Sequence, residues 1–587
     1  MATVSFGQQS IKKKSNKLST KTNHKLRIYQ VMIHLWGNTT QTNKINGTLE
    51  ENGVGKFDDF NEKALKSISD FGYSHIYFTG VIRHATTLDY SKIGVPTQNA
   101  LNIKGLAGAP FAVTDYYDVN PFLATNPENR ISEFENMVAR CHKAGLKVII
   151  DCVPNHVARE YESIAKPKGV KDFGENDDNK KAFDPQNNFY YLPNQHYTSP
   201  ITKNGNASVE IYHEYPAKVT GNDVFNANPS VDDWFETVKL NYGVDYQDHR
   251  KKHFDPLPST WLKMEEMLKY WSKKGVDGFR CDMAEMVPVE FWGYVIPKIK
   301  KTNPSIVFIA EIYNPNEYHN YIKNGKFDYL YDKVGLYDAL RRLMENKPEA
   351  NANHITKVWQ NESGDISENM LRFLENHDEQ RITSDFFAKD PWTAIPAMTV
   401  AATLHNGPLM LYFGQEFGEK AMDEEGFGKK DGRTTMFDFW TVTEHAKWIN
   451  GGKFDGAGLS ENQKRLAQFY SSLIKFTKDN EAINNGQFYD LQYANTNAQG
   501  YDNRLVYSYL RYTNKQKLLI VCNFSQDKSY NIKLSIPDHA LELMKINKGK
   551  TLKIIDKTNG KNIANFNARE SLNIELPALG VVIYELK

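Results

Sequence analysis

Cysteine is scarce in this chain, with four residues in 587. Cys141, Cys152, Cys281 and Cys522 show no Cys-x-x-Cys spacing, which argues against a zinc site or a disulfide framework. Two of them fall in predicted buried strands, so we expect ordinary core thiols. This pattern favours a cytoplasmic location; a secreted or periplasmic one requires that a signal peptide has been removed.

Long hydrophobic runs are also missing. The most apolar window, Ala394–Phe413, is broken at residues 405–408 by His-Asn-Gly-Pro, which favours a helix, a turn and a buried strand over a membrane span. Residues 1–26 are rich in lysine but lack the apolar stretch of a secretory signal. We therefore predict a mobile basic tail and no membrane anchor.

Neither sign of charge is in excess, since 72 Lys and Arg face 71 Asp and Glu. This balance gives no reason to expect nucleic acid or an anionic membrane as a partner. Aromatic residues make up 12% of the chain, which suits the stacking of neutral sugars, although most aromatic rings in any protein pack in its core. We expect no organic cofactor, and the sequence leaves the oligomeric state open.

Short apolar strands alternate with amphipathic helices from about residue 27 to about residue 480, which is typical of βα units around a parallel sheet. Eight such units predict a (β/α)₈ barrel with its active site at the carboxyl ends of the strands. The predicted strands are Ile28–His34, His75–Phe78, Lys147–Cys152, Gly278–Cys281, Ile306–Ala310, Tyr329–Tyr331, Leu371–Leu374 and Leu409–Tyr412. The clearest helices are Asn61–Phe71, Ile131–Ala144, Pro258–Lys274, Pro288–Lys300, Ile395–Leu404 and Gln463–Lys478.

Two segments depart from this alternation. The connection after the third strand is far too long for a plain loop, and residues 157–245 within it predict an inserted domain that forms a lid or one wall of a cleft. Residues 481–587 change to a period of two, as in NRLVYSYLRY and KLLIVCNFS, which predicts an antiparallel β-sandwich.

Three predicted strands run directly into an acid. GFRCD ends at Asp282, FIAE ends at Glu311, and FLENHD ends at Asp378. Because the carboxyl ends of barrel strands share one rim, these acids predict one acidic site. Cleavage of a glycosidic bond uses two carboxyl groups that face each other across the bond, so this is our leading hypothesis.

The neighbours of these acids support such a site, although each has a plainer interpretation. Arg280 lies two positions before Asp282 on the same strand face and is expected to lower the pKa of that carboxyl, yet a structural ion pair is equally consistent with the spacing. His377 precedes Asp378, and a carboxylate beside an imidazole can bind vicinal sugar hydroxyls. In DCVPNH, His156 could bind a hydroxyl and Asn155 could bind a calcium ion through its amide oxygen, although a lone His or Asn is more often structural.

Together these motifs resemble the α-amylase family of glycoside hydrolases. The resemblance rests on four ordered signatures: DCVPNH at 151–156, GFRCD at 278–282, AE at 310–311 and ENHD at 375–378. GAPFAVTDYYDVNP at 108–121 and NGPLMLYFGQE at 406–416 also look like the family's segments. The resemblance implies a (β/α)₈ barrel, a domain inserted after strand three and a C-terminal β-sandwich, in agreement with the pattern of elements.

By position, the resemblance implies that Asp282 is the nucleophile, Glu311 the general acid and base, and Asp378 the third acid, which binds sugar hydroxyls. It implies further sugar contacts from Arg280, His156, His377 and Phe111, and a double displacement that retains the anomeric configuration. The chain departs from the family where Glu285 and Met286 replace a frequent Lys-His pair, and where Phe111 replaces a frequent Tyr.

The expected substrates are starch, glycogen or maltooligosaccharides, with α-1,4 or α-1,6 bonds. The same site also supports transglycosylation, in which a sugar acceptor replaces water. Two other hypotheses are a non-catalytic carbohydrate-binding relative, which should have lost at least one of the three acids, and a metal-dependent hydrolase using Asp151, His156, His377 and Asp378, which lacks a compact ligand motif.

Overall fold

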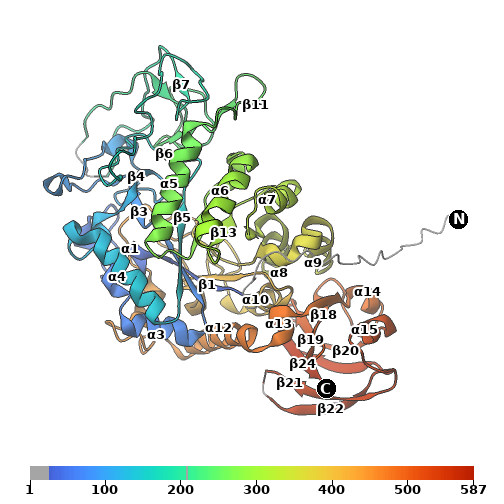
Figure 1. Ribbon diagram of the computed structural model, residues 1–587. Helices are drawn as coiled ribbons and strands as arrows, with labels where there is room; N and C mark the ends of the chain where they lie inside the picture. Colours follow the sequence, from blue (N-terminus) through green and yellow to red (C-terminus); the bar gives the residue numbers. More distant parts are fainter. Residues whose placement is uncertain (1–24, 206–208, 559) are drawn as a thin grey trace.

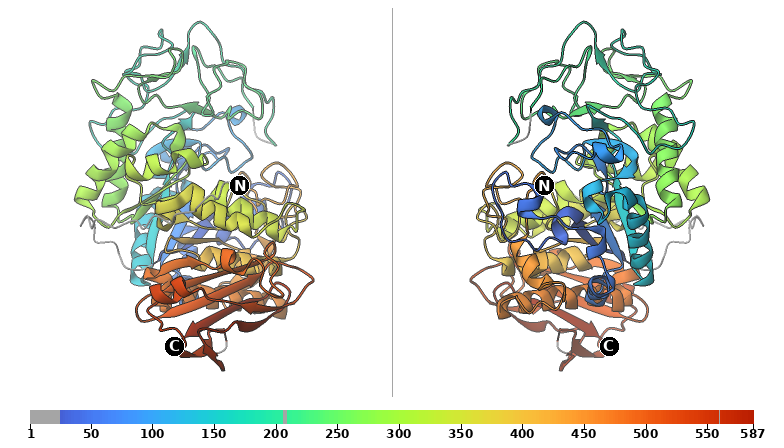
Figure 2. Two further views of the ribbon diagram at one scale, coloured as in Figure 1. Left: turned by 90° about the vertical axis from the view of Figure 1, so that its right-hand side faces the viewer. Right: turned by 90° about the vertical axis from the view of Figure 1, so that its left-hand side faces the viewer.

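The computed structural model describes residues 25–205, 209–558 and 560–587. Its parts are stacked along the long axis of the molecule (Figures 1 and 2). The segment between β5 (Lys147–Cys152) and α5 (Ser259–Lys273) lies at one end, the barrel in the middle and the C-terminal sheets at the other end. No helix in the described part of the chain combines the length and the apolar character needed to cross a membrane.

Eight parallel strands form the central sheet, in the spatial order β15-β14-β13-β12-β5-β2-β1-β16. A parallel bridge between Arg372 and Leu409 joins the two outer strands and closes the barrel. The strands are β1 (Arg27–Met32), β2 (His75–Thr79), β5 (Lys147–Cys152), β12 (Gly278–Cys281), β13 (Val307–Ala310), β14 (Tyr329–Tyr331), β15 (Met370–Leu371) and β16 (Leu409–Tyr412).

This arrangement confirms the predicted barrel, and six of the eight strands lie within one residue of their predicted ends. The first strand ends early because the chain turns at Met32 into the short helix α1 (Ile33–Trp36). The seventh strand pairs regularly only at Met370 and Leu371, after which Arg372 contributes the single bridge to Leu409. The segment that follows β15 and carries Asp378 is therefore a loop rather than a strand.

Amphipathic helices surround the barrel. The helix α3 (Glu62–Phe71) is capped by the Asn61 side chain and is followed by Gly72, whose φ of 114° favours glycine. The helix α12 (Glu461–Asp479) begins with a capping box between Ser460 and Gln463. The predicted helices are observed as α3 (Glu62–Phe71), α4 (Arg130–Lys143), α5 (Ser259–Lys273), α6 (Val289–Thr302), α10 (Ala394–Thr403) and α12 (Glu461–Asp479), with the shorter α7 (Tyr318–Lys323) and α8 (Asp338–Met344) between strands.

The predicted tail extends too far by at least two residues. Residues 1–24 lie outside the described residues, but Lys25 and Leu26 are buried. The Lys25 ammonium donates to the His405 carbonyl at 2.8 Å, and the Leu26 carbonyl accepts from the Leu409 amide. Both residues therefore belong to the base of the barrel.

The inserted segment consists of loops and short two-stranded pairs rather than a larger sheet. Its strand β6 (His156–Ala158) pairs with β9 (Thr237–Lys239), β7 (Tyr191–Leu192) pairs with β8 (Ala217–Lys218), and β10 (Val244–Asp245) pairs with β11 (Lys251–Lys252). The β6–β9 pair starts directly after β5, so it ties the insertion to the rim of the barrel.

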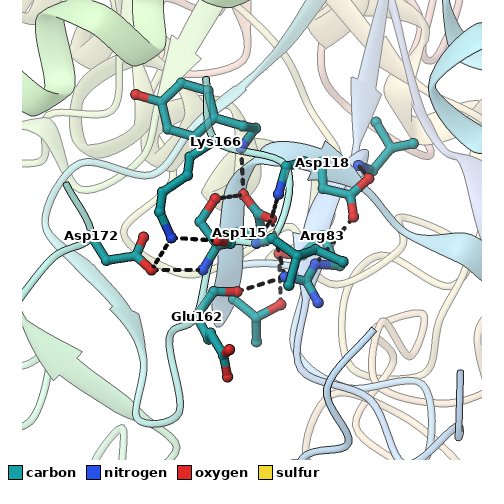
Figure 3. Close-up of polar contacts among 12 residues, drawn as sticks. Arg83, Asp115, Asp118, Glu162, Lys166 and Asp172 are labelled. Carbon is teal, nitrogen blue, oxygen red and sulfur yellow. Dashed lines mark hydrogen bonds and ion pairs between the residues drawn. The ribbon is translucent and has the colours of Figure 1, made fainter. Parts of the chain in front are cut away.

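A buried ion-pair cluster fixes the hairpin of β3 (Ile82–His84) and β4 (Val113–Val119) to the start of the insertion (Figure 3). The Arg83 guanidinium lies 3.1 Å from Asp115 and 3.4 Å from Asp118 and also donates to the Glu162 carbonyl. Asp115 in turn accepts from the amides of Ile164 and Ala165. Removing one partner of a buried ion pair leaves the other charge unpaired, which is costly. This cluster therefore ties the β3–β4 hairpin to residues 162–165.

The C-terminal part is entirely antiparallel, as predicted. It comprises a six-stranded sheet, β17-β18-β19-β24-β21-β22, and a two-stranded sheet, β20-β23. The two sheets share one apolar core, which makes a sandwich. The strands are β17 (Gln487–Asp490), β18 (Val506–Tyr512), β19 (Lys517–Asn523), β20 (Tyr530–Leu534), β21 (Thr551–Asp556), β22 (Asn562–Asn567), β23 (Leu572–Leu576) and β24 (Val581–Leu586).

All four cysteines are free and buried, as the sequence predicts. They therefore behave as small core side chains.

Candidate active site

The three acids meet at one cavity at the carboxyl ends of the barrel strands. Asp282 follows β12, Glu311 follows β13, and Asp378 lies in the loop after β15. All three line a cavity of about 210 Å³, together with Phe111 and His156. The structure thus brings together five of the residues selected from the sequence.

A single guanidinium joins the two acids at the centre of this cavity. Arg280 is buried, and its Nη1 donates to Asp282 Oδ1 at 2.6 Å, while its Nη2 lies 2.9 Å from Glu311 Oε2. The same Nη1 lies 3.3 Å from Asp151, which also accepts from the Tyr77 hydroxyl at 2.6 Å. Two carboxyl groups bound to one guanidinium must lie close together, so the predicted Arg280–Asp282 pair proves to be part of the acidic site.

The Glu311 carboxyl is held by two further donors. The Met283 amide donates to Oε2 at 2.8 Å, and the Tyr313 hydroxyl donates to Oε1 at 2.5 Å. Met283 has a φ of 42°, a left-handed conformation that is unfavourable for a non-glycine residue. This turn directly after Asp282 directs the Met283 amide at the Glu311 carboxyl. The strained backbone conformation therefore contributes a hydrogen bond to the site.

The electrostatics of Asp282 differ from the sequence-based prediction. We expected Arg280 to lower the pKa of this carboxyl, but burial raises the pKa well above its usual value, and Arg280 only opposes that rise. Glu311, Asp151 and Asp378 raise it further because they place like charges nearby. Burial likewise raises the pKa of Asp151 to about 6. One cation therefore contacts three buried acids, Asp151, Asp282 and Glu311.

His377 is buried beside Asp378 and is held in one tautomer. Burial and Arg280 lower the pKa of His377 well below its usual value, so the ring is neutral. Gln30 Nε2 lies 2.8 Å from Nδ1, which assigns Nδ1 as the acceptor and places the proton on Nε2. Nε2 lies 3.1 Å from Asp378 Oδ2 and therefore orients that carboxylate toward the cavity.

Aromatic and charged side chains, most of which the sequence analysis did not assign, complete the cavity wall. Trp234 packs against His156 with ring centroids 5.2 Å apart, and Phe111 packs against His377 at the same separation. The sequence analysis missed Tyr313 although it lies two residues after Glu311. The long segment after β16 carried no signal in the sequence, yet it contributes Phe427, Met436 and Phe437. The ion pair of Lys104 and Glu236 also lines the cavity.

Glu285, where the resemblance implies a frequent lysine, has a local structural role. Its Oε2 accepts from the backbone amides of Tyr313 and Asn314, each at 3.1 Å. This carboxylate therefore ties the loop after β12 to the loop after β13, on which Glu311 and Tyr313 lie.

Asn155, the predicted calcium ligand, lies beside a lysine. Its Oδ1 accepts from Lys239 Nζ at 2.8 Å, and its Nδ2 donates to the Gly221 carbonyl at 2.7 Å. The amide oxygen that would bind a calcium ion thus already binds a positive charge, so these donors do not fit a divalent cation. Among the described residues, no group of three or more His, Cys, Asp or Glu could hold a metal ion, which leaves the metal-dependent hydrolase hypothesis without a ligand set.

The raised pKa of Asp378 predicts a change in stability with pH. Burial, then Glu311, raises this pKa from 3.8 to about 7, so the folded protein binds a proton that the unfolded chain releases. The resulting stabilisation is present below about pH 4 and is lost as the pH rises through about 7. We expect Asp378→Asn to raise the midpoint of thermal unfolding by a few degrees at about pH 8 and to change it little at about pH 4.

Calorimetry of the wild type and the variant at both pH values checks this expectation. Asp385→Asn is a matched control because Asp385 is an exposed aspartate in the same loop, and it should leave the midpoint unchanged at either pH. A lower midpoint for Asp378→Asn at about pH 8 would contradict the assigned repulsion.

A parallel eight-stranded barrel with two carboxyl groups at one cavity, at the carboxyl ends of its strands, is typical of (β/α)₈ glycoside hydrolases. The chain belongs to the α-amylase family. It matches the family model of the alpha-amylase catalytic domain over residues 50–486 and that of the alpha-amylase C-terminal all-beta domain over residues 500–587.

The proteins that are similar to this chain share little sequence identity with it. "Alpha-amylase 3" of Dictyoglomus thermophilum is 20% identical over 461 residues, which cover 76% of this chain and 79% of that protein. "Oligo-1,6-glucosidase" of Halalkalibacterium halodurans is 22% identical over 492 residues, covering 70% and 80%. The solved structure of a noncanonic maltogenic alpha-amylase from Thermotoga neapolitana matches with a TM-score of 0.60 at 18% identity, covering 96% of this chain and 98% of that one. These similarities support the fold.

Proposed function

We propose that this enzyme cleaves α-glucosidic bonds of starch, glycogen or maltooligosaccharides by a double displacement that retains the anomeric configuration. The observation that supports this most strongly is the Arg280 guanidinium, which holds Asp282 and Glu311 at one cavity. A guanidinium that contacts both carboxyl groups keeps them near enough to act on one bond, as a nucleophile and a proton donor must.

In the first step, the Asp282 carboxylate attacks the anomeric carbon while the bond to the leaving oxygen breaks and Glu311 gives that oxygen its proton. A glycosyl ester on Asp282 results. In the second step, the Glu311 carboxylate takes a proton from water, the water oxygen attacks the anomeric carbon, and the Asp282 carboxylate leaves. Arg280 is available to both carboxylates throughout.

The remaining side chains bind and orient the sugar. Asp378 accepts hydrogen bonds from sugar hydroxyls, and His377 orients its carboxylate. His156 is neutral because burial, then Lys239, lowers its pKa to about 3, so it can donate one proton to a hydroxyl. Phe111 offers a partly exposed ring to the apolar face of the sugar.

The anomeric form of the first products tests this proposal. Proton NMR of maltoheptaose during the first turnovers should show new reducing ends as the α anomer, before mutarotation. New β anomers would contradict retention, and no cleavage of maltoheptaose, starch, pullulan or cyclodextrin would contradict the proposed substrate class. Products longer than the substrate would assign transglycosylation to the same site.

A further inference from the structure

The groups that surround the Lys239 side chain favour a positive charge. It lies on β9, which pairs with β6, and its backbone is in register with His156. The side chain is 2% exposed, and its Nζ lies 2.8 Å from Asn155 Oδ1 and 2.5 Å from Asp223 Oδ1. The same ammonium lies 5.3 Å from the centre of the Tyr246 ring. An amide oxygen, a carboxylate and an aromatic face all favour a cation.

These contacts join two parts of the molecule. Asn155 belongs to the rim of the barrel, three residues after β5, whereas Asp223 belongs to a turn of the insertion, where its φ is 67°. Asn155 also binds the Gly221 carbonyl, so its amide group contacts the insertion through both of its ends. The lysine therefore holds the insertion against the barrel next to the cavity.

We propose that the Lys239 ammonium is a built-in substitute for a bound divalent cation, and that it positions His156 for the sugar through Asn155. Asn155 Nδ2 lies 3.1 Å from His156 Nδ1, so orienting the amide also orients the imidazole. With Oδ1 bound to the ammonium, the amide must direct Nδ2 at His156 and Gly221. This assigns Nδ1 as an acceptor and places the ring proton on Nε2.

The charge balance explains why a metal ion would not add to this arrangement. The single charge of Lys239 pairs with the single charge of Asp223. A calcium ion needs six to eight oxygen ligands, and a second cation beside the ammonium would be repelled strongly in this buried place. Lys239 is thus a positioning residue, since it acts through Asn155 and does not line the cavity.

The first test uses the wild-type protein with EGTA or with added calcium chloride. We expect the midpoint of thermal unfolding and the activity on maltoheptaose to be the same in both. A midpoint that falls in EGTA and recovers with calcium would overturn the proposal. This measurement of stability does not rest on the proposed function, so the two can fail separately.

The second test uses Lys239→Met, which keeps the length of the side chain and removes its charge. We expect the midpoint to fall by several degrees, and KM to rise roughly 5–10-fold with a smaller change in kcat, because His156 loses its orientation. Lys263→Met is the matched control, since the Lys263 ammonium also binds an asparagine oxygen, Asn188 Oδ1, at 2.8 Å, but lies away from the cavity. It should lower the midpoint without raising KM.

Two results would count against the proposal. If Lys239→Met left both the midpoint and KM unchanged, the lysine would hold nothing in place. If it lowered the midpoint but raised KM no more than Lys263→Met, its role would be structural alone. Should Lys239→Met fail to fold, the EGTA comparison on the wild type still decides whether a metal ion is needed.

Discussion

Replacing Asp282 by asparagine is expected to lower kcat/KM on maltoheptaose by about 10⁴-fold or more. The amide has nearly the same shape as the carboxylate but cannot form the glycosyl ester, so the first displacement stops. Because the substitution also removes a buried negative charge from among like charges, the folded state should be at least as stable as the wild type. Steady-state kinetics and a thermal unfolding curve test both statements.

The control for this experiment is again Asp385→Asn, in the loop that carries Asp378 but exposed. It should keep the wild-type rate within about twofold, as surface substitutions usually have small effects. Activity of Asp282→Asn within about tenfold of the wild type would show that the nucleophile lies elsewhere, and would leave the non-catalytic and the metal-dependent alternatives to be reconsidered.

Glu311→Gln is expected to have the second largest effect, and one that depends on the leaving group. General acid catalysis contributes about 10²–10⁴-fold, so cleavage of maltoheptaose should fall by that factor. Fluoride leaves without a proton, so the first step on α-maltosyl fluoride should be nearly as fast as in the wild type. The second step lacks its base, and added azide should restore turnover by attacking the ester directly.

Rates on both substrates, with and without azide, separate this role from a structural one. Glu317→Gln is the control on the same loop, since Glu317 contacts Asn320 and lies outside the cavity. An equal loss of rate on maltoheptaose and on α-maltosyl fluoride would contradict the assignment of Glu311 as the proton donor.

The sequence analysis predicted those parts of the fold and the site that depend on short, local patterns of residues. A buried parallel strand has a short apolar run as its sequence pattern, and an acid directly after that run lies at the rim of the barrel. The strands β12 and β13, with Asp282 and Glu311 at their ends, were therefore predictable. Asp378 was predicted from the same pattern, although its strand β15 has only two regular residues and the acid lies in the loop beyond it. The family resemblance gave His156 and His377 their expected roles.

The remaining features depend on contacts between distant segments, which no local pattern encodes. Phe427, Met436 and Phe437 reach the cavity because the segment after β16 folds back over it. The direction of the Asp282 pKa shift was predicted wrongly because the sequence shows its neighbour Arg280 but not the three other acids or the depth of burial. The contact of Lys239 with Asn155 spans 84 residues and required the structure.

The most direct test of the central claim is to trap the glycosyl ester. A fluorinated α-glucosyl fluoride slows both displacements, and Glu311→Gln also lacks the base for the second step, so the ester should accumulate in that variant. Mass spectrometry of the intact protein and of its peptides should then find one glycosyl group, attached to Asp282. A label on any other residue, or rapid turnover with no covalent adduct, would contradict a double displacement through Asp282.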